Sequence, residues 1–60
     1  MKKTLALKQL LEDGKTIIKN EELNGFYQDI ELYEIVSNSS IEYYEFDLNN
    51  GKTLIELKMN

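Results

Sequence analysis

The hydrophobic residues near the start of the chain recur at the spacing of an α-helix. Leu7, Leu10 and Leu11 stand at positions i, i+3 and i+4, between Thr4, a typical N-cap residue, and Gly14, a typical residue just beyond a helix end. The pattern therefore predicts a helix that ends at Gly14. Its first residues are basic and its last are acidic, which opposes the helix dipole, so we expect its leucines to be held by packing on another element.

The last twenty residues predict a β-hairpin. Two hydrophobic runs, Ile41–Leu48 and Thr53–Met59, are joined through Asn50-Gly51, the pair that favours a two-residue type I′ turn. A turn of this length fixes which residues lie opposite each other in the two strands. The predicted pairs are Leu48 with Thr53, Phe46 with Ile55, and Tyr44 with Leu57.

The segment 26–36 fits both regular structures. A helix face would be made of Phe26, Ile30 and Tyr33. One face of a strand would be made of Ile30, Leu32 and Val36. We favour a strand because Gly25 precedes the segment and because aromatic and β-branched residues are dense within it, but the helix stays open as an alternative.

These elements, with a short strand over Lys15–Asn20, predict an α+β fold formed by a single domain over residues 1–60. One N-terminal helix packs on a small antiparallel sheet of three to four strands, arranged as a β-meander. The expected core face of the sheet is Ile30, Leu32, Val36, Tyr44, Phe46, Leu48, Ile55, Leu57 and Met59.

The composition limits the chemistry that we expect. The chain contains no cysteine, histidine, proline or tryptophan, so it has neither disulfides nor the ligands of a Cys/His zinc site. No motif for a catalytic residue, a metal or a cofactor is recognised, and we expect a protein that is not an enzyme. Sixty residues build only a small core, which favours stabilisation as a homodimer.

Negative charge is concentrated in the middle of the chain. Residues 21–50 contain eight acidic residues and neither lysine nor arginine, within a chain of net charge −4. Such a block repels phosphate and attracts a basic surface, so we expect a protein partner with a basic surface and no direct binding of nucleic acid. No apolar run is long enough to span a membrane, and no secretory signal is recognised, so the expected location is the cytoplasm. The cations are all lysine and asparagine is frequent, which favours an AT-rich bacterial or phage source.

The predicted register also defines a candidate binding surface on the sheet face away from the helix. On that face Glu45 would lie opposite Glu56, and Glu31 opposite Asp47, two like-charge pairs that a cationic partner would relieve. Tyrosine and aliphatic residues would form its centre, as in many protein interfaces. The candidate partner-binding residues are Glu31, Tyr33, Ile35, Tyr43, Glu45, Asp47, Leu54 and Glu56.

The predicted function is therefore a protein-binding module. Its specific form is a small phage-type, anti-defence inhibitor that binds a host enzyme through this acidic, tyrosine-bearing face, with carboxylates in the place of nucleic-acid phosphates. The alternative is a structural or assembly protein that self-associates through its sheet face.

Overall fold

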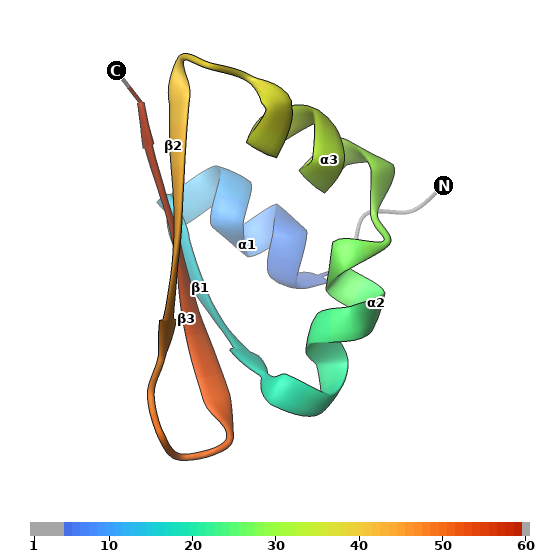
Figure 1. Cartoon of the computed structure of the whole chain (residues 1–60), viewed down its shortest axis with the longest axis vertical. Helices are drawn as coiled ribbons and strands as arrows, with labels where there is room; N and C mark the ends of the chain where they lie inside the picture. Colours follow the sequence, from blue (N-terminus) through green and yellow to red (C-terminus); the bar gives the residue numbers. More distant parts are fainter. Residues whose placement is uncertain (1–4, 60) are drawn as a thin grey trace.

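The computed structural model describes residues 5–59 and confirms an α+β fold with helices on a small antiparallel sheet. The elements, in chain order, are α1 (Leu5–Asp13), β1 (Lys15–Lys19), the 3₁₀ turn η1 (Asn20–Glu22), α2 (Leu23–Tyr27), α3 (Ile30–Ser37), β2 (Ile41–Asp47) and β3 (Lys52–Met59). The strand order is β1-β3-β2, with both pairs antiparallel. The helices lie on the same side of the sheet, which leaves its other face open (Figure 1).

The first helix and first strand form as the sequence predicts. Leu7 and Leu10 are fully buried, and the amide of Gly14 donates to the carbonyl of Leu10 at 2.8 Å, which closes the last turn of α1. Gly14 has a φ of 77°, a left-handed conformation that favours glycine. Its carbonyl accepts from the amide of Leu57 at 2.8 Å, so this residue ends the helix and also aligns β1 with β3. The expected N-cap, Thr4, lies outside the described residues.

The segment 26–36 is helical, so the favoured strand is wrong. Asp29 adopts an extended conformation and its side chain accepts from the amide of Glu31 at 3.0 Å, which is the N-cap that starts α3. Leu32 is buried and Ile35 packs against the core, so these two residues form the inward face of the helix. Ile30, Tyr33 and Val36 point outward and are exposed. The third strand of the sheet is therefore β1.

The hairpin forms, but its register differs by one residue from the predicted one. The amide of Leu48 donates to the carbonyl of Lys52 at 3.0 Å, which leaves three residues in the loop instead of two. Asn49 and Gly51 both have positive φ, and the side chain of Asp47 accepts from the amide of Asn49 at 2.8 Å. Tyr44 therefore lies opposite Glu56, Phe46 opposite Leu54, and Glu45 opposite Ile55. A one-residue shift turns every side chain of β2 to the other face.

The core lies between the helices and the inner face of the sheet. Its buried hydrophobic residues are Leu7, Leu10, Ile18, Phe26, Leu32 and Ile55. Of the nine predicted core residues, Leu32 and Ile55 are buried and Leu57 is half-buried. The other six are exposed. Ile30 and Val36 are exposed because α3 is a helix, and Tyr44, Phe46 and Leu48 because β2 and its continuation are turned over. Met59 is exposed at the last position of β3.

The cap of α3 can be tested by two substitutions at Asp29. We expect Asp29→Ala to lower the free energy of unfolding by about 1 kcal/mol, because the amide of Glu31 loses its acceptor. Asp29→Asn keeps a capping oxygen and should stay close to the wild type. Urea unfolding followed by far-UV circular dichroism measures both, and an equal loss in the two variants would contradict the capping role.

Candidate functional site

The open face of the sheet is the candidate functional site. Because side chains alternate along a strand, the observed register assigns a defined set to this face. The set is Lys15, Ile17 and Lys19 from β1, Lys52, Leu54, Glu56 and Lys58 from β3, Glu42, Tyr44 and Phe46 from β2, and Leu48, which continues the alternation of β2. This set is called the open face below.

A hydrophobic row crosses the middle of the open face. Leu54 lies opposite both Ile17 and Phe46, so the three side chains form one line across the three strands. Ile17 is 56% exposed and Phe46 is 46% exposed. Exposed hydrophobic residues are common singly, but a continuous row is typical of a binding surface, and no helix within residues 5–59 covers this one.

Aromatic side chains extend this row along β2. The rings of Tyr44 and Phe46 are nearly parallel, at 18°, with centroids 6.3 Å apart. The ammonium of Lys58 lies 5.7 Å from the centroid of the Tyr44 ring, a cation–π contact. The hydroxyl of Tyr44 donates to Glu42, and this hydrogen bond to a carboxylate raises the pKa of Tyr44.

The charges on the open face are mainly positive. Four of the five lysines within residues 5–59 lie on it, whereas nine of the eleven acidic residues lie elsewhere. Lys19 lies directly opposite Lys52, a like-charge pair of the kind that destabilises a sheet by a few tenths to about 1 kcal/mol. The predicted like-charge acidic pairs do not form, because Glu45 faces Ile55 and Glu31 lies on α3.

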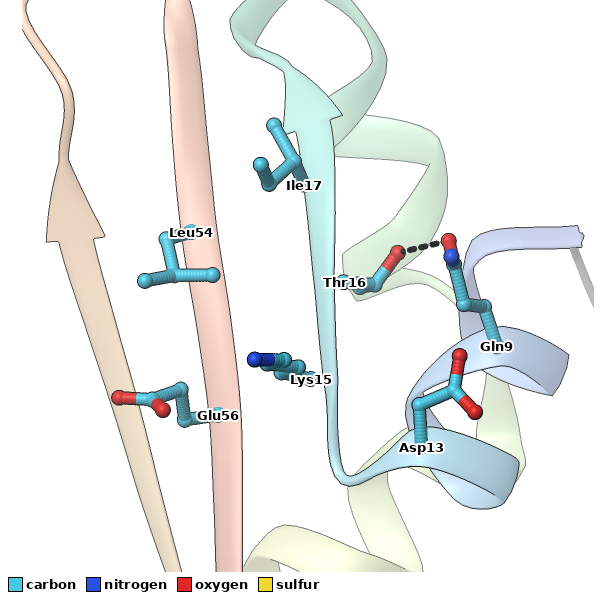
Figure 2. A pocket seen from close by; sticks show the side chains of 7 residues that line it. All are labelled: Gln9, Asp13, Lys15, Thr16, Ile17, Leu54 and Glu56. Atoms are coloured by element: carbon cyan, nitrogen blue, oxygen red, sulfur yellow. Dashed lines mark hydrogen bonds between the residues drawn. The ribbon is translucent and has the colours of Figure 1, made fainter.

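A hollow of about 350 Å³ lies at the β1 end of the open face (Figure 2). Ile17 and Leu54 line it from the open face, and Gln9 and Thr16 line it from the helix side. The hydroxyl of Thr16 donates to Oε1 of Gln9 at 2.8 Å, which ties α1 to the edge strand. Asp13 of α1 and Glu56 of β3 also line the hollow, and their carboxylates lie on opposite sides of β1.

A second polar cluster lies on the helix side of β2. The hydroxyls of Tyr27 and Tyr43 both donate to the carboxylate of Glu45, at 2.8 Å and 2.6 Å. Burial raises the pKa of Tyr27 to about 12, with further contributions from the hydrogen bond to Glu45 and from its charge. The same causes, burial first, raise the pKa of Tyr43. Within residues 5–59, no group of three or more acidic side chains is placed to hold a metal ion.

The eight predicted partner-binding residues do not form one surface. Glu31, Tyr33 and Ile35 lie on α3, and Ile35 packs against the core. Tyr43, Glu45 and Asp47 lie on the helix side of β2, where the structure brings Tyr43 and Glu45 together. Only Leu54 and Glu56 lie on the open face. The open-face residues that the prediction missed are Lys15, Ile17, Lys19, Glu42, Tyr44, Phe46, Leu48, Lys52 and Lys58.

Comparisons with family models, with curated proteins and with solved structures gave no match to this chain. No helix within residues 5–59 is long and apolar enough to cross a lipid bilayer. The function is therefore argued from the surfaces described above.

The cluster around Glu45 predicts a loss of stability at alkaline pH. The pKa of Tyr27 is about 12 in the folded protein and close to 10 in an unfolded chain. The neutral phenol therefore stabilises the fold fully below pH 10, and this stabilisation is lost as the pH rises toward 12. Tyr27→Phe removes that contribution, so its urea midpoint should fall less steeply between pH 10 and 12 than that of the wild type. Equal slopes for the two proteins would contradict the assignment.

Proposed function

We propose that the protein is a non-enzymatic protein-binding module and that the open face is its docking surface. The observation that carries this proposal is the row of Ile17, Leu54 and Phe46 on a face that no helix within residues 5–59 covers, with Ile17 and Phe46 exposed and Leu54 half-buried between them. The row would supply the apolar contact, and burying it against a partner is favourable because apolar surface leaves water.

The arrangement around the row supports the same proposal. Protein interfaces combine an apolar, often aromatic, centre with a charged rim. On the open face, Tyr44 stacks on Phe46 of the row, and lysines lie around them. A partner for this face would present an apolar centre and acidic side chains. A basic partner surface, as the sequence predicted, would instead meet the helix side, where most acidic residues lie.

The docking proposal can be tested with two matched substitutions. Phe46→Asp places a charge in the middle of the hydrophobic row and should remove capture of the partner from a bacterial lysate, because the charge would have to lose its water on binding. Leu5→Asp is the control, because Leu5 is 83% exposed at the start of α1 and lies outside the open face. Capture is read by mass spectrometry at low and high salt. Equal retention of the partner by both variants would refute docking on the open face.

A second candidate function uses the acidic helix side. We propose that the protein acts in the cytoplasm of a bacterial host as a phage-type inhibitor, with carboxylates in the phosphate sites of a nucleic-acid-handling enzyme. The supporting observation is that nine of the eleven acidic residues lie off the open face. Two of them, Glu31 and Glu34, are on α3, which also carries Tyr33 with 73% of its surface exposed. Duplex DNA or single-stranded RNA should then displace the protein from the captured enzyme. An enzyme that binds both together would overturn this role while leaving docking on the open face intact.

A further inference from the structure

We propose that the open face binds an acidic amphipathic helix of the partner, with a carboxylate of that helix between Lys19 and Lys52 and its apolar stripe on the hydrophobic row. This inference rests on the proposed function, because it names the chemistry of the partner for the same docking surface. Lys19 and Lys52 lie where β1 ends beside the loop between β2 and β3, and this end of the open face is called the hairpin end (Figure 1).

The positive charge of the open face is compensated everywhere except at the hairpin end. On the far side of the hydrophobic row, each lysine has a glutamate directly opposite, and these pairs are Lys15 with Glu56 and Lys58 with Glu42. At the hairpin end, Lys19 instead lies opposite Lys52, and Leu48 is the residue of β2 beside them. The two glutamates of the open face are therefore both distant from the opposed lysines, and the excess positive charge lies at one end.

The opposed lysines border a hollow of about 330 Å³. Glu21 of η1 also lines it, together with Asn50 and Gly51 of the hairpin loop. The three charged side chains sum to +1, which one carboxylate neutralises. Each ammonium group has three donors and a carboxylate has two acceptor oxygens, so one carboxylate can accept from both lysines.

The pairing of Lys19 with Lys52 weakens the free sheet, because like charges directly opposite each other repel. Both side chains are exposed at the ends of their strands, so neither contributes to the core. A carboxylate held between them would replace one repulsive contact with two attractive ones. The pair therefore favours an anionic ligand over a role in holding the sheet together.

The hydrophobic row determines where the apolar part of the ligand lies. Lys19 and Lys52 are each two residues from the row along their strands, so the carboxylate and the apolar contact are about 7 Å apart. The face offers side chains and not backbone groups, so a segment bound on it must satisfy its own backbone hydrogen bonds, as an α-helix does. Two turns of a helix are about 11 Å long, which matches the width of three strands.

The same charge pattern disfavours a nucleic acid on the open face. A single strand of DNA or RNA binds where a positively charged groove follows its backbone. Here the lysines beyond the hydrophobic row face glutamates, so the positive charge does not continue along the face. The net charge of −4 also repels phosphate. A helix with carboxylates along one side of an apolar stripe fits both the hairpin end and the row.

Synthetic helical peptides test the inference by fluorescence anisotropy in about 0.1 M salt. The acidic peptide has about 15 residues, with a leucine stripe and glutamates along one side of it. The basic peptide has lysines in place of the glutamates, and the apolar-free peptide has alanines in place of the leucines. The acidic peptide should bind with a dissociation constant in roughly the micromolar to millimolar range, as expected for a small surface, and the other two should not bind.

Two matched double variants locate the carboxylate. Lys19→Gln with Lys52→Gln should weaken binding of the acidic peptide about tenfold, because two charge contacts are lost. The same variant should have a higher urea midpoint than the wild type, because the like-charge repulsion is removed. The control, Lys15→Gln with Lys58→Gln, removes the same charge from the same face. It should change binding less than about twofold, because these lysines lie about 14 Å or more from the hairpin end, beyond the Debye length.

Several outcomes would overturn the inference. One is an acidic peptide that does not bind, and another is equal weakening by both double variants, since the carboxylate would then have no fixed place. A urea midpoint that falls together with binding in Lys19→Gln with Lys52→Gln would give the pair a structural role. Binding of a single-stranded oligonucleotide in place of the acidic peptide would assign the open face to nucleic acid. Self-association that the acidic peptide does not reverse, measured by sedimentation velocity, would assign it to a second copy.

The failure of this inference can be distinguished from failure of the proposed function. If Phe46→Asp removes partner capture while Lys19→Gln with Lys52→Gln captures the partner as the wild type does, docking on the open face stands and the carboxylate site is wrong. If Phe46→Asp retains the partner, docking itself is refuted. Far-UV circular dichroism of each variant shows that it is folded.

Discussion

The length of the loop between β2 and β3 decides which side chains of the hairpin face the helices. With the closing hydrogen bond at Leu48 and Lys52, three residues form the loop and each residue of β2 points opposite to where a two-residue turn would place it. Tyr43 then packs toward the core, and Tyr44 and Phe46 face solvent. The contribution of β2 to the open face, including its two aromatic side chains, depends on this one residue of loop length.

The thin architecture makes some exposure of hydrophobic residues unavoidable. One helical layer on three strands buries six hydrophobic side chains within residues 5–59, as expected for a domain of this size. An exposed isoleucine or phenylalanine would therefore carry little information by itself. The informative feature is the arrangement, because Ile17, Leu54 and Phe46 lie in one line across three strands, although they are distant in the sequence.

The sequence predicted local features well and long-range placement poorly. The spacing of the leucines and the glycine at position 14 predicted α1, and the asparagine–glycine pair predicted the hairpin.

The register of the hairpin was predicted wrongly because Asn49 also adopts positive φ, which lengthens the loop by one residue. Asparagine tolerates this conformation, and the sequence carries no distinctive signal for it. The N-cap of α3, Asp29, is a residue type typical of helix starts, but the strand was favoured from Gly25 and from the density of aromatic and β-branched residues alone. The eight candidate partner-binding residues therefore do not share one face, because a single helix and a single turn place six of them elsewhere than expected.

The distribution of charged side chains affects whether the edges of this small sheet can pair with a strand of another chain. The acidic block of the sequence is largely directed to the helix side by folding, and of its members only Glu42 reaches the open face. β1, one edge of the sheet, carries Lys15 and Lys19, and charged residues on an edge discourage the addition of another strand. β2, the other edge, carries three acidic residues among its seven. Because both edges are charged and the middle of the open face is apolar, contact through the face is favoured over contact through the edges. A partner that docks on the open face contacts side chains, and their pattern can select one partner. An unpaired edge strand would instead offer backbone groups, which can pair with any extended chain.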